Sequence, residues 1–503
     1  MSEFKQKVVK GFTWAFLERL SIQFAGFFIS MVLARLLTPS DFGTVALLTI
    51  FLSLSMVLAD SGFGQALIQK KNATETDFNS VFYLSICLSF VVYGVLFLCA
   101  PWIAAFYDDP RLIPIFRVLS ITVVLNAVNS IQNAELNRKL LFHLSFRIGI
   151  LTSLTTAVVG VPLAYLGFGP WALVWSAVAG AFVGVLARWF LISWRPGRLF
   201  SWRALRDLFH FGWKMTLSSL LDAAYDNFYG LLIGKLYSRT DLAFVDKGQV
   251  VPKIATDTIN STLGTVAFPV LARIQDKLFQ VRESMRRMIS CSTFFVFPIM
   301  AGCAICAPDL IDLVYGDQWM PAVPYVRLAC FSFALRPLDT INLKGLVAIG
   351  HSEVFLKLEL IKKTIGFVAM FLAIPYGVWW MMAVGAFVIG PLGLFINSWP
   401  TGRLLKYTFF MQLRDVGQNL VITMLMSVIV YGLSFFSENL IVRLLFQVGL
   451  GGSVYFFLSW LVRARSLVEF ARILYPVCCR KAPSCLRPFC NVFFSRLIVG
   501  KER

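Results

Sequence analysis

Long apolar runs, separated by short polar segments, set the pattern of the sequence. A helix that crosses a bilayer needs about 20 mostly apolar residues. Fourteen runs have this length to within a few residues at each end: 12–36, 42–68, 81–106, 112–133, 146–166, 170–192, 211–236, 250–271, 288–315, 325–349, 355–374, 378–399, 420–436 and 440–462. The pattern predicts an all-α membrane protein with about 14 transmembrane helices.

The composition agrees with this pattern. Of the 503 residues, 58% are apolar and 15% are charged, whereas soluble globular chains have about 45–50% and about 25%. A water-soluble enzyme, a disordered chain and a coiled coil are therefore excluded. The net charge of +19 has its simplest explanation in basic cytoplasmic loops rather than in nucleic-acid binding.

Basic residues fall in alternate segments between the apolar runs. The segments around 138–147, 188–206, 273–287 and 403–414 are rich in Lys and Arg, whereas those between them are short and often acidic. Cytoplasmic loops carry the excess of Lys and Arg in membrane proteins. The alternation therefore predicts an even number of spans, with both termini in the cytoplasm.

A repeat of 200 residues divides the chain. Residues 17–64 and 217–264 share eight identities without a gap. The alternative explanation is that two apolar hairpins agree at these positions by chance. Each copy holds six predicted helices, and an even number gives both copies the same direction in the membrane. We therefore expect two six-helix bundles related by a pseudo-two-fold axis along the membrane normal. The predicted parts are the bundles 1–206 and 207–410, two further helices in 411–463, and a basic cytoplasmic tail, 464–503.

Polar side chains interrupt the apolar runs at helical spacing. Ionisable groups within spans face a protein interior or water, because they are costly in lipid. The residues concerned are Glu18, Arg19, Asn126, Asn129, Lys214, Asp222, Asp226, Lys253, Asp257, Arg336 and Asp339. At an offset of 210 residues Asn126 meets Arg336 and Asn129 meets Asp339, so one face is neutral in the first half and charged in the second. We expect the two bundles to face each other across a polar cavity.

The basic members of this set suit an anionic ligand. Arg and Lys, together with hydroxyls and tyrosines, suit a phosphate joined to a sugar. The candidate substrate-binding residues are Arg19, Lys214, Lys253, Arg336, Asn126 and Asn129. The alternative is that Glu18/Arg19, Lys253/Asp257 and Arg336/Asp339 are ion pairs that only hold helices together.

The acidic members are candidates for ion coupling. No Walker A motif is present, so an ion gradient or a binding partner is the expected energy source, and no cofactor or metal site is expected. Asp222 and Asp226 lie one helical turn apart, so their charges repel and favour a shared proton. This pair is the preferred coupling site, with Glu18, Asp257 and Asp339 as further carboxylates. The alternative is that the pair only accepts hydrogen bonds from tyrosines or sugar hydroxyls.

Several short motifs carry a family resemblance. The stretch Leu33 to Gly43 (LARLLTPSDFG) resembles the first-loop signature of Wzx-type polysaccharide and O-antigen flippases, of the colanic-acid and lipopolysaccharide exporter type. These belong to the multidrug/oligosaccharidyl-lipid/polysaccharide exporter superfamily. Segments 60–69, 233–238, 266–269 and 313–319 extend the resemblance. Where the family often has Asn-Arg-Gly, this chain has Asp246-Lys247-Gly248. Lys247 is a candidate substrate-binding residue, but its ammonium group lacks the bidentate donor geometry of an Arg guanidinium.

The resemblance implies a flippase and not an enzyme. Such a protein would move an undecaprenyl-diphosphate-linked oligosaccharide, a lipopolysaccharide or exopolysaccharide unit, to the outer leaflet of a bacterial inner membrane. It would work by alternating access and use a proton or sodium gradient. Membrane lipids and components of a polysaccharide polymerase are the implied partners, nucleic acid is not, and a monomer is expected.

Three alternatives remain at the level of the sequence. A drug/cation antiporter of the same fold would favour an acidic cavity rather than a basic one. A membrane polymerase or ligase of lipid-linked sugars usually carries a large outer loop with catalytic Arg or His, whereas the outer loops here are short. A structural scaffold would not need charged residues inside its spans.

Overall fold

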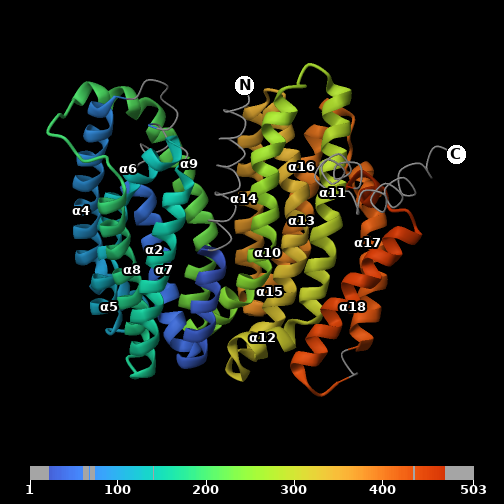
Figure 1. Cartoon of the computed structure of the whole chain (residues 1–503), viewed down its shortest axis with the longest axis horizontal. Coiled ribbons are helices and arrows are strands. Elements are labelled where there is room, and N and C mark those ends of the chain that lie inside the picture. Colours follow the sequence, from blue (N-terminus) through green and yellow to red (C-terminus); the bar gives the residue numbers. More distant parts are fainter. Residues whose placement is uncertain (1–21, 61–66, 68–73, 140, 434–436, 471–503) are drawn as a thin grey trace, which may run out of the picture. The chain divides into compact units, whose positions relative to one another are not determined.

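Helices account for all regular structure in the part of the chain that the computed structural model describes, residues 22–60, 67, 74–139, 141–433 and 437–470 (Figure 1). This confirms the predicted all-α fold. The elements are a helix Ile22–Leu36, α2 (Pro39–Asp60), α4 (Glu75–Phe106), α5 (Leu112–Leu119), α6 (Ile121–Arg138), α7 (Phe142–Tyr165), α8 (Pro170–Leu191), α9 (Trp202–Leu236), α10 (Arg239–Ala272), α11 (Leu278–Ile305), α12 (Ala307–Tyr315), η1 (Asp317–Ala322), α13 (Val323–Ala348), α14 (Ser352–Ala373), η2 (Ile374–Tyr376), α15 (Val378–Val384), η3 (Gly385–Ile389), α16 (Gly390–Leu405), α17 (Phe409–Gly432) and α18 (Leu440–Leu461).

Every predicted apolar run overlaps at least one of these helices. Within the described residues, nine helices are long and apolar enough to cross a membrane. The long helices α9, α10, α13 and α14 fall outside that set; α9, α10 and α13 carry the polar and charged stripes seen in the sequence, and α14 carries Glu353, Lys357, Glu359, Lys362 and Lys363. The count of 14 spans stays a prediction, as does the place of the tail beyond residue 470, which lies outside the described residues.

Local hydrogen bonds determine where two equivalent helices begin. At the start of α2, the Thr38 N–H and hydroxyl donate to Asp41 Oδ2 at 3.0 and 2.7 Å, and the Asp41 N–H donates to Thr38 Oγ1. At the start of α10, Ser238 Oγ donates to Asp241 Oδ2 at 2.7 Å, and the Asp241 N–H donates back to Ser238 Oγ. These caps satisfy amide groups that the first turn leaves without helical partners. They are 200 residues apart, at equivalent positions of the repeat seen in the sequence, and the duplication itself stays a prediction.

The chain divides into two compact units, Met1–Phe244 and Val245–Arg503. In the first unit α9 packs along α2, where a Cβ atom at Gly234 would overlap the side chain of Leu47. This close packing explains why α9 groups with the helices before it. The bundle boundary after residue 206 was predicted from the internal repeat, and it stays a prediction.

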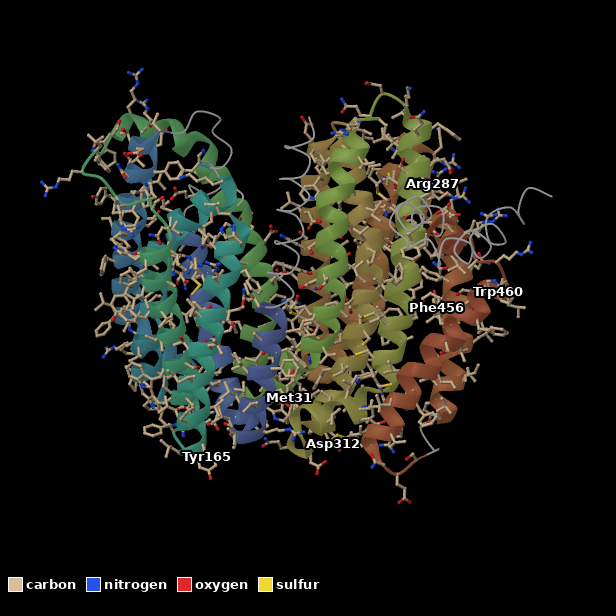
Figure 2. All side chains as sticks on the ribbon, viewed as in Figure 1. Met31, Tyr165, Arg287, Asp312, Phe456 and Trp460 are labelled. Carbon is tan, nitrogen blue, oxygen red and sulfur yellow. The ribbon has the colours of Figure 1, made fainter. Side chains whose placement is uncertain are left out.

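Each unit has its own apolar core. In the first unit Leu48 of α2, Ala100 of α4 and Phe116 of α5 are almost fully buried against one another. In the second unit, Met285 of α11 and Ile341 of α13 are fully buried in a core to which α10, α16 and α17 also contribute. Many other apolar side chains are exposed, among them Phe456 and Trp460 of α18, each 51% exposed (Figure 2). A broad apolar exterior is what contact with lipid requires.

A buried polar network attaches α17 to the second unit. Asn419 Nδ2 donates to the Ser290 carbonyl oxygen and to Thr293 Oγ1 of α11, both at 3.0 Å. Ser466 Oγ donates to Asn419 Oδ1 at 2.7 Å, and Ser466 also bonds to Ser290 Oγ. All four side chains are buried. At the other end, Arg443 of α18 forms an ion pair with Asp309 of α12.

A wide helical turn interrupts the path from α15 to α16. η3 (Gly385–Ile389) is π-helical, which adds one residue to the turn, and Pro391 follows it at the start of α16. The turn lies beside α13 and α14.

We expect replacement of Asn419 by Leu to lower the free energy of unfolding by about 1–3 kcal/mol, because it leaves buried groups on α11 and at Ser466 without their partner. Thermal unfolding of the detergent-solubilised protein measures this. The matched control is Ser427→Ala on the same helix, whose hydroxyl bonds only to the Thr423 carbonyl oxygen of α17. Equal melting temperatures for the two variants would contradict the proposed attachment.

Candidate substrate-binding site

A cavity of about 550 Å³ opens in the first unit and has both polar and apolar side chains in its lining. The lining comes from the helix Ile22–Leu36, from Phe42 of α2, and from α6, α7 and α8. Its polar lining residues are Ser30, Asn126, Asn129, Asn133, Thr152, Ser153, Thr156, Ser176 and Arg188. Two residues predicted to bind substrate, Asn126 and Asn129, are therefore brought together here.

The asparagines come from one face of α6. Positions 126, 129 and 133 follow the i, i+3, i+7 spacing that places side chains on the same side of a helix. Arg188 of α8 meets this face, with Nε donating to Asn133 Oδ1 at 3.1 Å and Nη1 to the Gly184 carbonyl oxygen at 3.0 Å. Asn129 is only 4% exposed. Its Oδ1 atom has no hydrogen-bond partner among the residues that the structure describes.

The opposite wall comes from α7 and α8, which pack closely. A Cβ atom at Gly180 would lie 2.6 Å from Thr156 Oγ1, so glycine is needed for this approach. Gly180, Gly184 and Arg188 recur every four residues on α8, as do Thr152 and Thr156 on α7. This spacing is visible in the sequence and could have predicted the packed face of α7 and α8. Arg188 was instead counted among the basic residues of a cytoplasmic loop.

Three of the basic candidates, Lys247, Lys253 and Arg336, lie in the second unit, on α10 and α13. Arg336 Nη1 donates to Asp257 Oδ1 at 2.8 Å, joining the two helices, and the side chains are 39% and 40% exposed. Lys253, one turn from Asp257, is exposed. Lys247 is buried, with Nζ 5.7 Å from the ring centre of Tyr315. The pairing of Arg336 with Asp257 crosses between helices, whereas the sequence suggested pairs within each helix.

Asp339 belongs to a separate contact. Its Oδ1 atom accepts a hydrogen bond of 2.9 Å from Asn397 Nδ2 of α16. A neighbouring buried network joins Asn342 of α13 to Gln412 of α17 and Thr401 of α16. This side of α13 is therefore occupied by contacts that hold helices together.

The other predicted residues are distributed differently. Asp222 and Asp226 are exposed on α9 in the first unit. Glu18 and Arg19 lie outside the described residues, and so does the side chain of Lys214 on α9. The predicted roles of all these residues stay predictions.

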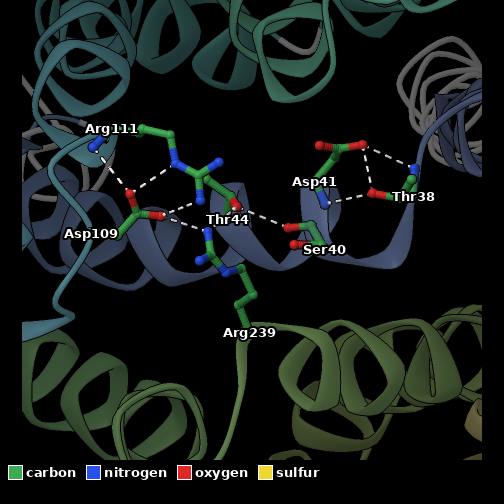
Figure 3. Close-up of polar contacts among 7 residues, drawn as sticks. All are labelled: Thr38, Ser40, Asp41, Thr44, Asp109, Arg111 and Arg239. Atoms are coloured by element: carbon green, nitrogen blue, oxygen red, sulfur yellow. Dashed lines mark hydrogen bonds and ion pairs between the residues drawn. The ribbon is translucent and has the colours of Figure 1, made fainter.

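A charged cluster closes the turn between α4 and α5 (Figure 3). Arg239, at the first position of α10, donates from Nη1 to Asp109 Oδ2 at 2.6 Å and to Thr44 Oγ1 of α2 at 3.4 Å. Arg111 Nε donates to Asp109 Oδ1 at 3.0 Å, so two guanidinium groups share one carboxylate. The neighbouring Asp108 pairs with Lys235 of α9. The two ion pairs join the α9–α10 turn to the α4–α5 turn.

The hydrogen bonds from Arg111, reinforced by Arg239, lower the pKa of Asp109 to about 2. Burial acts in the opposite direction but is outweighed. Asp109 is therefore ionised throughout the physiological pH range. The same contact raises the pKa of Arg111.

A family model described as polysaccharide biosynthesis protein matches residues 32–324, more than half of the chain. The chain belongs to this family. This agrees with the resemblance expected from the Leu33 to Gly43 motif.

Relatives and solved structures agree with this assignment. The lipopolysaccharide biosynthesis protein WzxC of Escherichia coli (strain K12) is 22% identical over 396 residues, which cover 78% of this chain and 77% of WzxC. The succinoglycan biosynthesis transport protein ExoT of Rhizobium meliloti (strain 1021) is 22% identical over 488 residues, 95% of this chain and 97% of ExoT. The structure of the lipid II flippase MurJ in an inward closed conformation has a TM-score of 0.72 at 13% identity, over 90% of this chain and 99% of MurJ.

The likeness to MurJ concerns the fold, and it identifies this polysaccharide biosynthesis protein as a helical membrane protein of the same architecture. The family model covers most of the residues that line the cavity in the first unit, from Leu33 to Arg188, and the charged part of α10, whereas Arg336 of α13 lies beyond its end.

We expect Asp109→Asn to lower the free energy of unfolding by about 1.5–3 kcal/mol at neutral pH, because charge-assisted hydrogen bonds are lost. A lowered pKa means that the contact stabilises the fold fully above the ordinary value of about 3.9 and loses its effect as the pH falls toward about 2. The difference in melting temperature between parent and variant should therefore be constant from pH 7 to about 4.5 and shrink below about 3.5. A difference that already vanishes between pH 6 and 5 would contradict the assignment.

Proposed function

We propose that this polysaccharide biosynthesis protein is a flippase for a lipid-linked oligosaccharide. The observation that carries the proposal is the presence of Lys247, Lys253 and Arg336 on α10 and α13, among the helices of a multi-pass membrane protein. Cations placed within membrane helices mark the path of an anionic substrate. An oligosaccharide joined to undecaprenyl through a diphosphate has such an anionic centre.

The geometry of Arg336 suits a diphosphate. Asp257 holds one side of the guanidinium at 2.8 Å, and the side chain keeps 39% of its surface exposed. A guanidinium held in this way presents a planar set of donors to phosphate oxygens without losing much side-chain entropy on binding. Lys253, exposed on the same helix as Asp257, adds a second positive charge.

Translocation requires the two predicted halves, 1–206 and 207–410, to open alternately toward each side of the membrane. The rigid elements of such a cycle are bundles, and their polar faces bind the substrate near the middle of the bilayer. We place the protein in a bacterial inner membrane with both termini in the cytoplasm, since basic residues accumulate at the ends that would face the cytoplasm. In the second unit Arg287 lies toward one end of the helices and Asp312 near the other, as this orientation requires (Figure 2).

Two other functions fit less well. A cation antiporter would need acidic rather than basic groups on the exposed faces of α10 and α13. A polymerase or ligase would need a reactive group to transfer the sugar, and the name of ExoT describes a transport protein. The proposal is therefore transport of the lipid-linked sugar, without chemistry on it.

The test is translocation of undecaprenyl-diphosphate-linked oligosaccharide by the full chain in proteoliposomes. We expect the parent to move the lipid and Arg336→Gln to lower the rate at least about tenfold, since charge-assisted contacts to phosphate are lost. Asp257→Asn removes the partner but keeps the cation, and should have a smaller effect.

The double variant Arg336→Gln/Asp257→Asn separates binding from architecture. If the pair only joins α10 and α13, removing both charges should restore the rate, because no unpaired charge remains. A restored rate would therefore contradict a role in binding substrate. A parent protein that moves no lipid-linked sugar under any gradient would contradict the flippase itself.

We further propose that Asp222 and Asp226 couple transport to a proton or sodium gradient. Their exposure on α9 makes them accessible to ions, and their spacing of one turn favours a shared cation. The variants Asp222→Asn and Asp226→Asn should keep lipid movement but lose most of its response to an imposed pH or sodium gradient. Variants that respond as the parent does would exclude this pair, and Asn227→Ala on the same helix is the control.

A further inference from the structure

The cavity in the first unit contains a buried polar atom that the described structure does not satisfy. Asn129 Oδ1 lies on the cavity wall, the residue is 4% exposed, and this oxygen accepts no hydrogen bond from any described residue. Buried carbonyl oxygens of this kind are rarely left without a donor, since the loss costs as much as a hydrogen bond. The oxygen therefore points to a guest in the cavity that carries a donor.

Three hydroxyls on the opposite wall, which α7 and α8 form, add further acceptors. Thr152 Oγ1 donates to the Gly149 carbonyl oxygen, Thr156 Oγ1 to that of Thr152, and Ser176 Oγ to that of Leu173, at 2.8–3.0 Å. Because each hydroxyl proton is used by its own helix, each oxygen presents lone pairs to the cavity. Donors come from the amide groups of the asparagines and from Arg188.

This mixture selects a class of ligand. A metal cation is disfavoured because Arg188 lines the cavity and no carboxylate is among the described lining residues. A simple anion is disfavoured because the hydroxyl protons point away from it. A ligand with several neutral hydroxyls can both donate to Asn129 and the threonines and accept from the amides. Ile29, Leu33 and Phe42 form an apolar part of the lining that suits the C–H face of a sugar ring.

We propose that the cavity is a subsite for a neutral pyranose of the translocated glycan, held by Asn129, Thr152 and Thr156. The inference rests on the proposed flippase function and deepens it, because it gives the sugar a site within the first unit that is distinct from the basic residues of α10 and α13. The volume of about 550 Å³ falls within the range of about 300–1,000 Å³ usual for small-molecule sites and exceeds the need of one ring.

The test compares two ligands on the full chain in nanodiscs: bare undecaprenyl diphosphate, and the same carrier bearing one glucose, galactose or N-acetylglucosamine. We expect the parent to bind at least one glycosylated carrier about 5–20-fold more tightly than the bare one. Thr156→Val keeps the branched shape but removes the acceptor, and should reduce that gain about 3–10-fold. Asn129→Leu should reduce it at least as much, and the affinity for the bare carrier should not change in either variant.

Thr155→Val is the matched control. Thr155 directly precedes Thr156 on α7, donates to the Leu151 carbonyl oxygen in the same way and is not among the residues that line the cavity. Equal effects of Thr155→Val and Thr156→Val would overturn the subsite, as would a parent that binds the bare carrier and gains nothing from any of the three sugars, the result expected if water alone fills the cavity. A parent that binds neither carrier would instead count against the flippase function on which the inference rests.

Discussion

Polar groups within an apolar bundle must find their partners inside the protein, and this constraint organises the structure. Backbone groups meet it by forming helices throughout the described residues. Side chains meet it by bonding between helices, as Asn419 does with α11 and Arg336 does with Asp257. Among the described residues Asn129 Oδ1 has no donor, and in the proposed subsite a sugar hydroxyl would supply one.

Features that depend on near neighbours in the sequence could be predicted. The apolar runs predicted the helices, and the caps at Thr38/Asp41 and Ser238/Asp241 follow directly from the spacing of three residues. The stripe of Asn126 and Asn129 could be placed on one face of a helix for the same reason. Family membership was likewise readable from a contiguous motif, Leu33 to Gly43.

Features that depend on the approach of distant helices could not be predicted. Charge spacing offered Asp257 a partner in Lys253 one turn away, yet the structure supplies Arg336 from α13, 79 positions along the chain. Arg188 was read as part of a basic loop, but it reaches across to Asn133 of α6. Such contacts depend on how side chains and glycines let helices approach, as Gly180 does at Thr156, and a single sequence contains no direct measure of that distance.

The π-helical turn η3 changes the phase of everything that follows it on α16. One added residue rotates the later positions by about 100° relative to an uninterrupted α-helix. Asn397 and Thr401 are the side chains of α16 that bond to Asp339 and Asn342 of α13. Their alignment with α13 is therefore a property of the insertion as much as of the residues themselves. Deletion of one residue between Gly385 and Ile389 would turn this face away from α13, although the sequence would keep all of its polar residues.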